Sequence, residues 1–522
     1  MSIDIQNIII VGGGSAGWMT AATIASQINN VNITVVESPN IPTVGVGEST
    51  VGGIRAWLRM VGIHDKDFVK ETDASYKLAI KFNNFHKHDS GSWYYPFGQP
   101  LFDNCMHQRD DWFIKKTLYP ETPSDDYVDC YYPQMSLVKE NKMLVDHPDL
   151  KGFDFYNDTA FHFDAAKLGI WLRDKFCKNL GVKYVNGEVV TCNKSDIGID
   201  SIVLDNGDKI FGDLFIDCTG FNSLLLGKAM KVPFKSYEHI LPNNRAWATR
   251  VDYTDKEKQL DSVTDCSALE NGWVWNIPLW SRIGTGYVYS DNYINPKQAK
   301  IDFITHLNSK GYDTSNCTFK DIEMRVGIHE KLWVKNVVAI GLSAGFIEPL
   351  ESTGLLTTHD FATNLVRMLV RSNSISQWDR DEFNLVCDDT FNYWANFVSM
   401  HYALSHRNDS KYWKDITQKS YTNLMPALNN LQTQGLYYQS IYQKNFVDFL
   451  QDDDGVNCLA AGMNWNANDV TVLNKIFPKH IDKKSEFKDM IDNLDQRKEK
   501  WNNAIKHVPS LYEFLKENFY ND

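Results

Sequence analysis

The sequence predicts an α/β fold in which a Rossmann-like domain interlocks with an antiparallel sheet layer and a mostly helical C-terminal lobe. Three observations support this class. Strand, glycine-rich turn, helix and second strand follow one another within residues 7–37. Residues 245–290 alternate apolar and polar positions, as strands of an antiparallel sheet do. From about residue 355 the pattern turns helical through 450, and again at 465–517.

The N-terminal unit can be followed residue by residue. Residues 7–12 (NIIIVG) are a short apolar run that ends in glycine, which predicts a buried parallel strand. Residues 15–29 have helical character, and residues 32–37 (NITVVE) predict the next strand. Further along, residues 164–181 predict an amphipathic helix. Residues 336–342 (NVVAIGL) predict another buried strand.

The segment from residue 85 to residue 160 has only weak periodicity. It is rich in Tyr, Trp, Pro, His and Asp, so we expect loops and irregular strands that lie over the core and cover the substrate. A chain of 522 residues usually splits into two or three lobes. We therefore expect residues 1–355 to hold the nucleotide-binding and sheet region, and residues 356–522 to form the helical lobe that completes the substrate pocket.

Composition disfavours several classes of function. The formal net charge is −13 and the pI is about 5.6, so the surface disfavours nucleic acid and anionic lipid. The start, MSIDIQNIII, lacks the features of a signal peptide, and no apolar run is long enough to span a bilayer. The nine cysteines are scattered without a C-x-x-C pair, which predicts reduced thiols in a cytoplasmic protein. The histidines suggest no metal site.

Gly12, Gly14 and Gly17 stand at the spacing G-x-G-x-x-G between the first strand and the first helix. The first glycine allows a tight turn, the second lets the backbone approach a pyrophosphate, and the third lets helix and strand pack closely. The helix N-terminus then faces the phosphates with free N–H groups. Glu37 ends the next strand, where an acid can accept hydrogen bonds from ribose hydroxyls. The sequence therefore predicts a dinucleotide site.

This motif alone leaves NAD and FAD open. Residues 213–220 (DLFIDCTG) have the form of a strand that leads into a glycine turn, which favours FAD. Residues 336–354 (NVVAIGLSAGFIEPLESTG) form a strand, a turn and a helix start, whose N–H groups would stabilise negative charge on a reduced flavin. Taken singly, each segment is explained equally well as an ordinary βα connection.

Six stretches of the chain resemble one known family. They are GGGSAGWMTAA at 12–22, IPTVGVGEST at 41–50, SYKLAIKF at 75–82, GWVWNIP at 272–278, GLSAGFIEPLESTG at 341–354 and HYALSHRNDSKYW at 401–413. Together they span most of the chain to about residue 415, and the G-W-x-W-x-I-P block is the most specific. On these motifs the sequence resembles the flavin-dependent tryptophan halogenases, whose FAD-binding domain is of the flavin monooxygenase type.

The resemblance implies a particular chemistry. Reduced FAD (FADH2), delivered by a separate flavin reductase, reacts with O2, and a halide held beside the ring is converted to hypohalous acid. This acid crosses a short internal tunnel to a small aromatic substrate and halogenates an electron-rich carbon. Because hypohalous acid is small and unselective, the two sites must be separate and the path dry. The halide stays open among chloride, bromide and iodide.

Lys77 matches the family's essential lysine, whose ammonium would hydrogen-bond hypohalous acid or be converted to a haloamine. Glu351 matches the second catalytic position, where a carboxylate assists the lysine or accepts the proton that the ring loses. Thr353 and Gly354 match the halide site, where backbone N–H groups hold the anion. Without the resemblance, Lys77 and Lys81 would be interpreted as two solvated lysines on one face.

The resemblance also extends the expected cofactor site. The segment from Gly45 to Ser49 matches a strap that covers FAD, and Ser352 is expected against the flavin. The full expected set is Gly12, Gly14, Ser15, Ala16, Gly17, Glu37, Gly45, Val46, Gly47, Glu48, Ser49, Val189, Gly341, Leu342, Ile347 and Ser352.

The substrate end departs from the tryptophan-specific members of the family. The expected pocket residues are Tyr95, Phe97, Tyr437, Tyr438 and Phe449. The family places an acid seven positions after the paired tyrosines, and here Lys444 falls near that position. A lysine repels a substrate ammonium, so we expect an indole-like or other electron-rich arene rather than free tryptophan.

Three functions stay open, with the halogenase leading. In a halogenase, Trp273 and Trp275 of the motif that ends at Pro278 would fill the space through which a monooxygenase admits substrate. As plain core residues, the two tryptophans would simply share one face of a strand. The alternatives are an FAD-dependent aromatic monooxygenase and a non-catalytic flavin-binding protein. A homodimer is compatible with all three.

Overall fold

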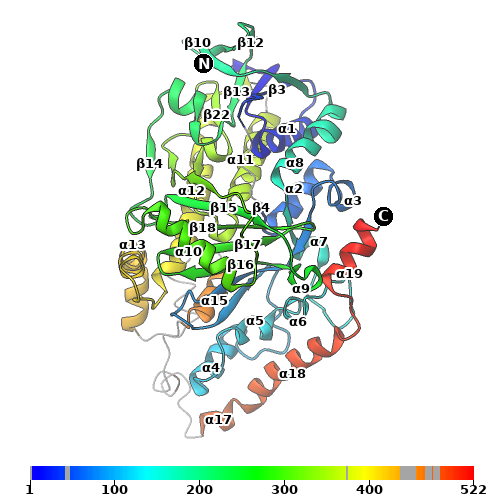
Figure 1. The fold of residues 1–522 in the computed structure, drawn as a ribbon, viewed down its shortest axis with the longest axis vertical. Helices are drawn as coiled ribbons and strands as arrows, with labels where there is room; N and C mark the ends of the chain where they lie inside the picture. The colour runs from blue at the N-terminus through cyan, green and yellow to red at the C-terminus, as the bar shows by residue number, and fades with distance from the viewer. Residues whose placement is uncertain are drawn as a thin grey trace.

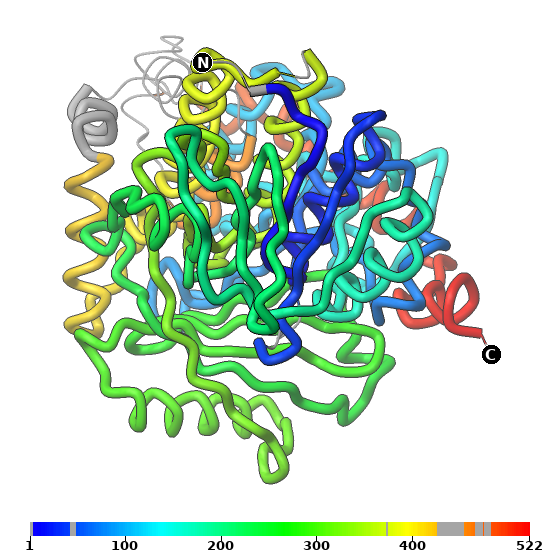
Figure 2. Tube along the Cα trace, turned by 90° about the horizontal axis from the view of Figure 1, so that it is seen from above, coloured from blue at the N-terminus to red at the C-terminus, as the bar shows by residue number. Residues whose placement is uncertain are grey.

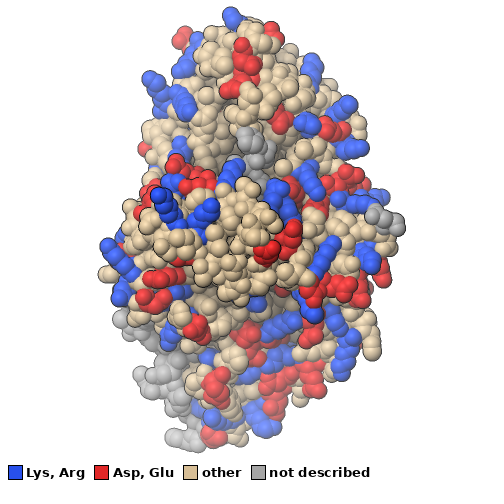
Figure 3. All heavy atoms as spheres, in the orientation of Figure 1, with Lys and Arg blue, Asp and Glu red and all other residues tan. Residues whose placement is uncertain are grey.

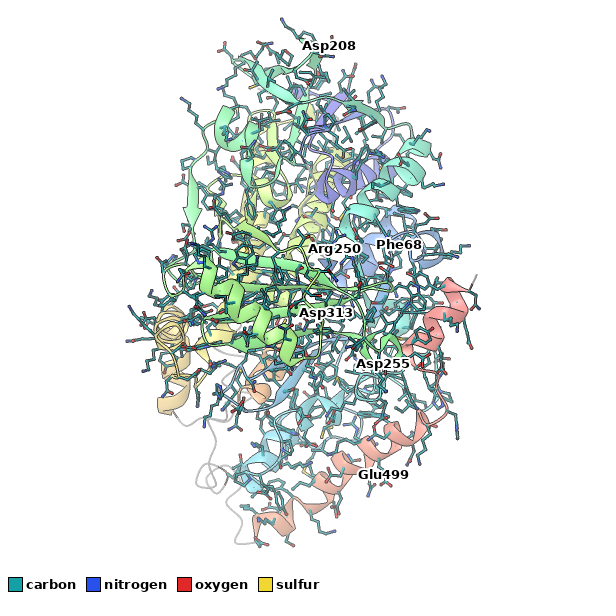
Figure 4. The ribbon with its side chains drawn as sticks, in the orientation of Figure 1. Phe68, Asp208, Arg250, Asp255, Asp313 and Glu499 are labelled. Atoms are coloured by element: carbon teal, nitrogen blue, oxygen red, sulfur yellow. The ribbon has the colours of Figure 1, made fainter. Side chains whose placement is uncertain are left out.

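The computed structural model describes residues 3–41, 48–371, 374–434, 454–464, 473 and 482–521. Its fold is α/β, as predicted, with a parallel sheet, a large antiparallel sheet and a helical C-terminal region (Figure 1). Asp208, in the turn before β12 (Lys209–Phe211), lies near one end of the long axis, and Glu499 of α18 (Lys488–Ala504) lies near the other. Arg250 of the large sheet lies between them (Figure 4).

The nucleotide-binding layer is a six-stranded sheet with a buried centre. Its strands follow the order β21 (Trp333–Val334), β22 (Val337–Ala339), β13 (Leu214–Asp217), β2 (Asn7–Val11), β3 (Asn32–Glu37) and β9 (Lys183–Asn186). All neighbours run parallel except β21 and β22. Helix α1 (Ser15–Gln27) packs against α11 (Thr353–Arg371). The predicted strands at 7–12, 32–37 and 336–342 are therefore confirmed.

A seven-stranded sheet forms the second layer. Its order is β19 (Lys320–Glu323), β15 (Arg245–Val251), β18 (Ile283–Tyr289), β17 (Gly272–Pro278), β16 (Val263–Leu269), β6 (Ala79–Asn83) and β7 (Ser92–Pro96). The antiparallel strands predicted within 245–290 are confirmed, and only the β6–β16 pair is parallel. Helix α10 (Pro296–Ser309) packs on β15 and β18, on the outer side of this sheet (Figure 2).

Four smaller sheets complete the strand pairing in the described residues. The one that matters for the site joins β4 (Glu48–Ser49), β8 (Ala160–Phe163) and β5 (Ser75–Lys77), with β8 in the middle. The others are β10 (Val189–Ser195) with β11 (Gly198–Leu204) and β12; β14 (Phe234–Ser236) with β20 (Gly327–His329) and β23 (Gly345–Phe346); and β1 (Ile3–Asp4) with β24 (Ser374–Ile375).

The prediction of loops and irregular strands at 85–160 is wrong for much of that segment. Besides β7 it holds α4 (Asp110–Leu118), α5 (Asp126–Tyr131), α6 (Met135–Lys139) and α7 (Phe155–Asp158). Helices this short show little periodicity, and tertiary packing stabilises them. Here the rings of Trp112, Phe113, Tyr127 and Tyr131 pack at centroid distances of 5.0 to 5.6 Å. Helix α18 covers α4 and α5.

Most of the remaining described helices follow the predicted pattern, although α15 (Asp454–Gly462) lies between the two predicted helical ranges, and residues 435–453, 465–472 and 474–481 lie outside the described residues. Residues 52–70 form α2 (Gly53–Val61) and α3 (Asp65–Phe68), and the segment 164–181 forms α8 (Ala165–Trp171), η1 (Leu172–Phe176) and η2 (Cys177–Leu180). The C-terminal region contains α12 (Gln377–Ala403), α13 (Lys411–Gln434), α15 (Asp454–Gly462), α17 (Lys483–Glu486), α18, α19 (Leu511–Leu515) and η7 (Lys516–Tyr520). The division after residue 355 falls inside α11 and stays a prediction.

The surface and the thiols agree with the composition. On the face seen in Figure 3, Lys and Arg side chains are interspersed with Asp and Glu, most densely at the lower right, where Figure 1 shows α18. All nine cysteines are free thiols. Within the described part of the chain, no helix is both long and apolar enough to cross a membrane. The same part contains no cluster of three or more metal-ligating side chains.

Candidate active site

The glycine motif lies where β2 meets the N-terminus of α1. Gly12 has φ +115°, and a Cβ there would lie 2.2 Å from the carbonyl oxygen of Cys218. A Cβ on Gly17 would lie 1.8 Å from the carbonyl oxygen of Gly12. Gly14 is the N-cap of α1 and provides no side-chain cap, so the first N–H groups of the helix are free to bind an anion.

Glu37 stands at the end of β3, beside this helix start. A Cβ on Gly13 would lie within 2.5 Å of three Glu37 side-chain atoms, so the acid lies directly against the glycine turn. Glu37 Oε2 is buried, lies 3.6 Å from Arg173 Nη1, and accepts no hydrogen bond of good geometry from the described residues. Burial raises the pKa of Glu37. A ribose hydroxyl would supply the donor that this oxygen lacks.

The other predicted cofactor residues are placed around the same edge. Ser15 and Ala16 begin α1, and a Cβ on Gly341 would lie 2.7 Å from Ala16 Cβ. Leu342 follows Gly341 in η5 (Gly341–Ser343), and Ile347 is buried. Val189 begins β10, directly after Glu188, whose carboxylate accepts a hydrogen bond from Asn40. Burial, with Asp164 nearby, raises the pKa of Glu48 to about 7. Three further members of the set, Gly45, Val46 and Gly47, lie outside the described residues.

Lys77 is buried at the end of β5. Its Nζ donates three hydrogen bonds: to Ser49 Oγ at 2.8 Å, to the Thr50 carbonyl at 3.0 Å and to Ser352 Oγ at 3.0 Å. The Phe97 ring lies beside it, with its centroid 5.0 Å from Nζ. Burial lowers the pKa of Lys77 to about 7, and the carboxylate of Glu351 opposes that shift. Such a lysine can act as ammonium or as amine near neutral pH.

Glu351 ends η6 (Pro349–Glu351) and is fully buried. Its Oε1 lies 2.7 Å from His401 Nε2 on α12, and His401 is fully buried as well. The stretch that begins at His401 is one of those that resemble the family, but the sequence predicts no role for this histidine. A histidine on an otherwise apolar helix face needs a polar partner in the core, although the sequence does not say which one. The turn ends at Ser352, which has φ +56°.

Thr353 and Gly354 are the first two residues of α11, a helix of 19 residues. Thr353 Oγ1 is buried and has no hydrogen-bond partner within the described ranges. A Cβ on Gly354 would meet no described atom within 4 Å. A helix N-terminus with free N–H groups, an unpartnered hydroxyl and open space beside it suits a small anion.

The tryptophans of the G-W-x-W-x-I-P block are both buried in β17. Their ring centroids lie 6.2 Å apart, as residues on one face of a strand should. Trp273 Nε1 donates to Glu348 Oε2 at 3.4 Å, and Asn243 Nδ2 donates to the same oxygen at 2.5 Å. Glu348 precedes the turn that carries Glu351. The block therefore packs against the segment that positions Glu351 and Ser352.

Two predicted pocket residues are described. Phe97 is buried beside Lys77, and the Tyr95 ring packs against Phe97 at 6.4 Å and against Phe397 of α12 at 5.8 Å. His401 packs on Phe397, with 5.6 Å between centroids. Aromatic rings therefore lie around the side chains of Lys77 and Glu351. The other pocket positions, Tyr437, Tyr438 and Phe449, lie outside the described residues, as does Lys444.

Comparison with known proteins agrees with this geometry. A profile of the tryptophan halogenase family matches residues 7–494. A 7-chloro-L-tryptophan 6-halogenase of Kutzneria sp. (strain 744) is 35% identical over 78% of this chain and 81% of its own length. A tryptophan 7-halogenase of Lentzea aerocolonigenes is 30% identical over 99% of both chains.

Solved structures are similar over the whole length. The apo structure of VirX1 matches with a TM-score of 0.90 and 36% identity, over 99% of this chain and 100% of that one. The tryptophan 6-halogenase of Streptomyces toxytricini matches with a TM-score of 0.82 and 30% identity, over 98% and 99% of the two chains.

The family profile, together with the fold and the glycine cradle, identifies an enzyme that depends on a flavin. More closely, the chain belongs to the flavin-dependent tryptophan halogenase family. The non-catalytic interpretation is thereby excluded, since this is a family of enzymes.

Proposed function

We propose that this enzyme halogenates an electron-rich, indole-like substrate through hypohalous acid that Lys77 directs. The observation that carries the proposal is the environment of Lys77: a buried ammonium held by three acceptors beside an aromatic ring. A monooxygenase that inserts oxygen directly into its substrate has no use for such a lysine.

The residues at the nucleotide end fit FAD. A side chain at Gly12 or Gly17 would clash with the neighbouring backbone. The N-terminus of α1 has N–H groups that can bind a pyrophosphate, and Glu37 Oε2 can accept a hydrogen bond from a ribose hydroxyl. Reduced flavin, when bound, supplies with O2 the oxidising power that converts halide to hypohalous acid. Thr353 and Gly354 would hold the halide at the N-terminus of α11, where the helix dipole favours an anion.

Lys77 would receive hypohalous acid in a site closed to water. As an ammonium, it must release one of its three present acceptors before it can donate a hydrogen bond that orients the acid and raises its electrophilicity; as an amine, it forms a haloamine. A pKa of about 7 leaves both routes open. Glu351, held by His401, would then accept the proton that the aromatic ring loses. The bulk of Trp273 and Trp275 would keep the organic substrate away from the flavin.

The substrate is proposed from the relatives and from the aromatic surroundings. The named halogenases of Kutzneria and Lentzea act on 7-chloro-L-tryptophan and tryptophan, and Tyr95, Phe97 and Phe397 place aromatic rings close to Lys77 and His401. Lys444, near the position where the family has an acid, disfavours free tryptophan. We further propose that a separate flavin reductase delivers the reduced cofactor.

The test is product analysis with halide as the variable. The protein is incubated with FAD, a flavin reductase, NADH, O2 and indole, with chloride, bromide or iodide in turn, and products are analysed by mass spectrometry. We expect a halogen mass shift that follows the halide supplied. Gain of one oxygen independent of halide would support the monooxygenase alternative, and absence of any product would contradict both.

A further inference from the structure

A row of hydrogen bonds leads from Lys77 to a buried histidine. Lys77 Nζ donates to Ser49 Oγ at 2.8 Å; Ser49 Oγ lies 2.7 Å from Thr264 Oγ1; Thr264 Oγ1 lies 2.9 Å from His162 Nε2. All four side chains are buried. The function proposed above gives no role to Thr264 or His162.

Sheet register explains this arrangement. In the small sheet, Ser49 of β4 and Ser75 of β5 both pair with His162 of the central strand β8. Ser75 and Lys77 are two residues apart on β5, so their side chains share a face with His162. Thr264 comes from β16 of the large sheet and bridges Ser49 to the imidazole.

A backbone carbonyl determines which atom donates in each hydrogen bond of this row. Ser75 Oγ donates to the carbonyl oxygen of Pro278 at 2.6 Å, so its hydrogen is committed. Ser75 Oγ must then accept from His162 Nδ1, which lies 3.3 Å away. The neutral imidazole therefore carries its hydrogen on Nδ1 and has its lone pair on Nε2, facing Thr264. Each link then donates toward His162: Lys77 to Ser49, Ser49 to Thr264, and Thr264 to His162.

The charges around this row of hydrogen bonds favour a single positive charge on the pair, on either Lys77 or His162. Burial lowers the pKa of His162 well below its ordinary value, and the positive charge of Lys77 lowers it further. Lys77 is faced by Glu351 from η6, Cys266 from β16 and His162 from β8. The other groups that contact the imidazole, Ser75, Thr264 and the Pro278 carbonyl, do not titrate. Once Lys77 becomes neutral, its repulsion of charge on His162 vanishes.

We propose that Ser49, Thr264 and His162 form a proton relay that takes one proton from Lys77 and later returns it. The proposal rests on the function proposed above and selects its haloamine route. One N–H bond of the Lys77 ammonium breaks, and the proton moves to Ser49 as the Ser49 hydroxyl proton moves to Thr264. The Thr264 hydroxyl proton moves to His162 Nε2 in the same way. Every hydrogen bond then survives with its direction reversed, so the transfer leaves no buried group unpaired.

The steps balance. The neutral amine of Lys77 attacks the halogen of hypohalous acid, an N–halogen bond forms, the halogen–oxygen bond breaks, and hydroxide leaves as water with the proton that the attacking nitrogen loses. The haloamine transfers the halogen to the aromatic carbon: the N–halogen and ring C–H bonds break, the C–halogen bond forms, and the ring proton, accepted first by Glu351, passes to the Lys77 nitrogen and leaves it a neutral amine. His162 then returns its stored proton through Thr264 and Ser49, which restores the ammonium. The relay stops at the Pro278 carbonyl, and because burial lowers the pKa of His162, the imidazole holds the proton only until the haloamine has given up its halogen.

The test compares variants that keep or remove the relay. His162→Gln keeps an acceptor for Thr264 but removes the base, Thr264→Val breaks the row, and Thr264→Ser keeps the hydroxyl. Thr249→Val, which removes a buried hydroxyl of the same sheet that donates to the Thr318 carbonyl, is the matched control. Halogenation of indole, FAD binding and thermal stability are measured from pH 6 to pH 9.

We expect His162→Gln and Thr264→Val to lose about tenfold or more in rate at pH 6, where Lys77 is an ammonium. The loss shrinks to about threefold or less at pH 8.5, where Lys77 loses its proton without help. Thr264→Ser should recover most of the rate, and Thr249→Val should keep the wild-type pH profile.

A uniform loss at every pH, or equal losses in Thr264→Val and Thr264→Ser, would overturn the relay. If Thr264→Val fails to fold, His162→Gln decides. Lack of halogenation by the wild-type enzyme would instead contradict the proposed function, whereas wild-type activity with unchanged profiles in folded variants would sink the relay alone.

Discussion

His401 Nε2 lies 2.7 Å from Glu351 Oε1, and both side chains are fully buried. The histidine comes from α12 and the carboxylate from the turn before α11, so the pair joins the C-terminal helices to the centre of the site. The carboxylate of Glu351 in turn acts electrostatically on Lys77.

Glu351→Gln should lower the halogenation rate by about a hundredfold while FAD binding is kept. The Glu351 carboxylate opposes the lowering of the Lys77 pKa, so its loss moves that pKa further below about 7. The acid limb of the pH–rate profile should therefore shift to lower pH. Glu323→Gln, at an exposed position, serves as control. An acid limb that does not move would contradict the coupling.

The stability of the flavin-free protein should depend on the charge state of Lys77. The folded pKa of about 7 is below the ordinary 10.5, so between these values the unfolded chain binds a proton that the folded protein does not. The free energy of unfolding therefore rises with pH in this window, by at most about 1.4 kcal/mol per pH unit. Denaturant unfolding should show that the free energy of unfolding of wild type rises from pH 7 to pH 10 relative to that of Lys77→Met. A constant difference would show that the pKa of Lys77 is not lowered.

Gly17→Ala should weaken FAD binding by about tenfold or more, since its Cβ would lie 1.8 Å from the Gly12 carbonyl oxygen and push α1 away from the turn. Flavin fluorescence titration measures the effect. As a control, Gly311→Asn alters a glycine with φ +84° and no neighbouring atom within 4 Å, and should bind FAD normally. Equal affinities in all three proteins would contradict the placement of the cofactor.

Gly354→Pro removes one backbone N–H at the start of α11 without breaking the helix, because proline is tolerated in its first turn. The KM for halide should rise about tenfold, while the KM for the aromatic substrate changes little. Gly354→Ala keeps the N–H group and should stay close to wild type in halide KM. Halide saturation curves for the two variants decide; a matching rise in both would point to crowding rather than to a lost N–H donor.

The sequence predicts those parts of the fold that depend on local pattern. The parallel strands at residues 7–12 and 32–37, the glycine turn between them and the strands within 245–290 all follow from periodicity and glycine spacing. The short helices of 85–160 escape such reasoning. Three of them, α4, α5 and α6, contact α18, which follows in the chain more than 300 residues later.

Several residues of the site could be predicted from the sequence, but most of their contacts could not. Lys77, Glu351 and the start of α11 could be named from motifs, yet what surrounds them depends on strand register and helix packing. His162 faces Ser49 and Ser75 only because β8 pairs with both β4 and β5. His401 reaches Glu351 only through the packing of α12, 50 positions along the chain. Nothing in the local sequence around either histidine marks these partners.

The central claim is that Lys77 carries the halogenation chemistry, and Lys77→Met tests it most directly. Lys81→Met is the matched control: Lys81 lies four residues away, is partly exposed and is 3.9 Å from Asp265. Both variants are assayed for FAD binding and for halogenated indole by mass spectrometry. We expect both to bind FAD, Lys81→Met to give product, and Lys77→Met to give none. Halogenation by Lys77→Met at the wild-type rate would contradict the account.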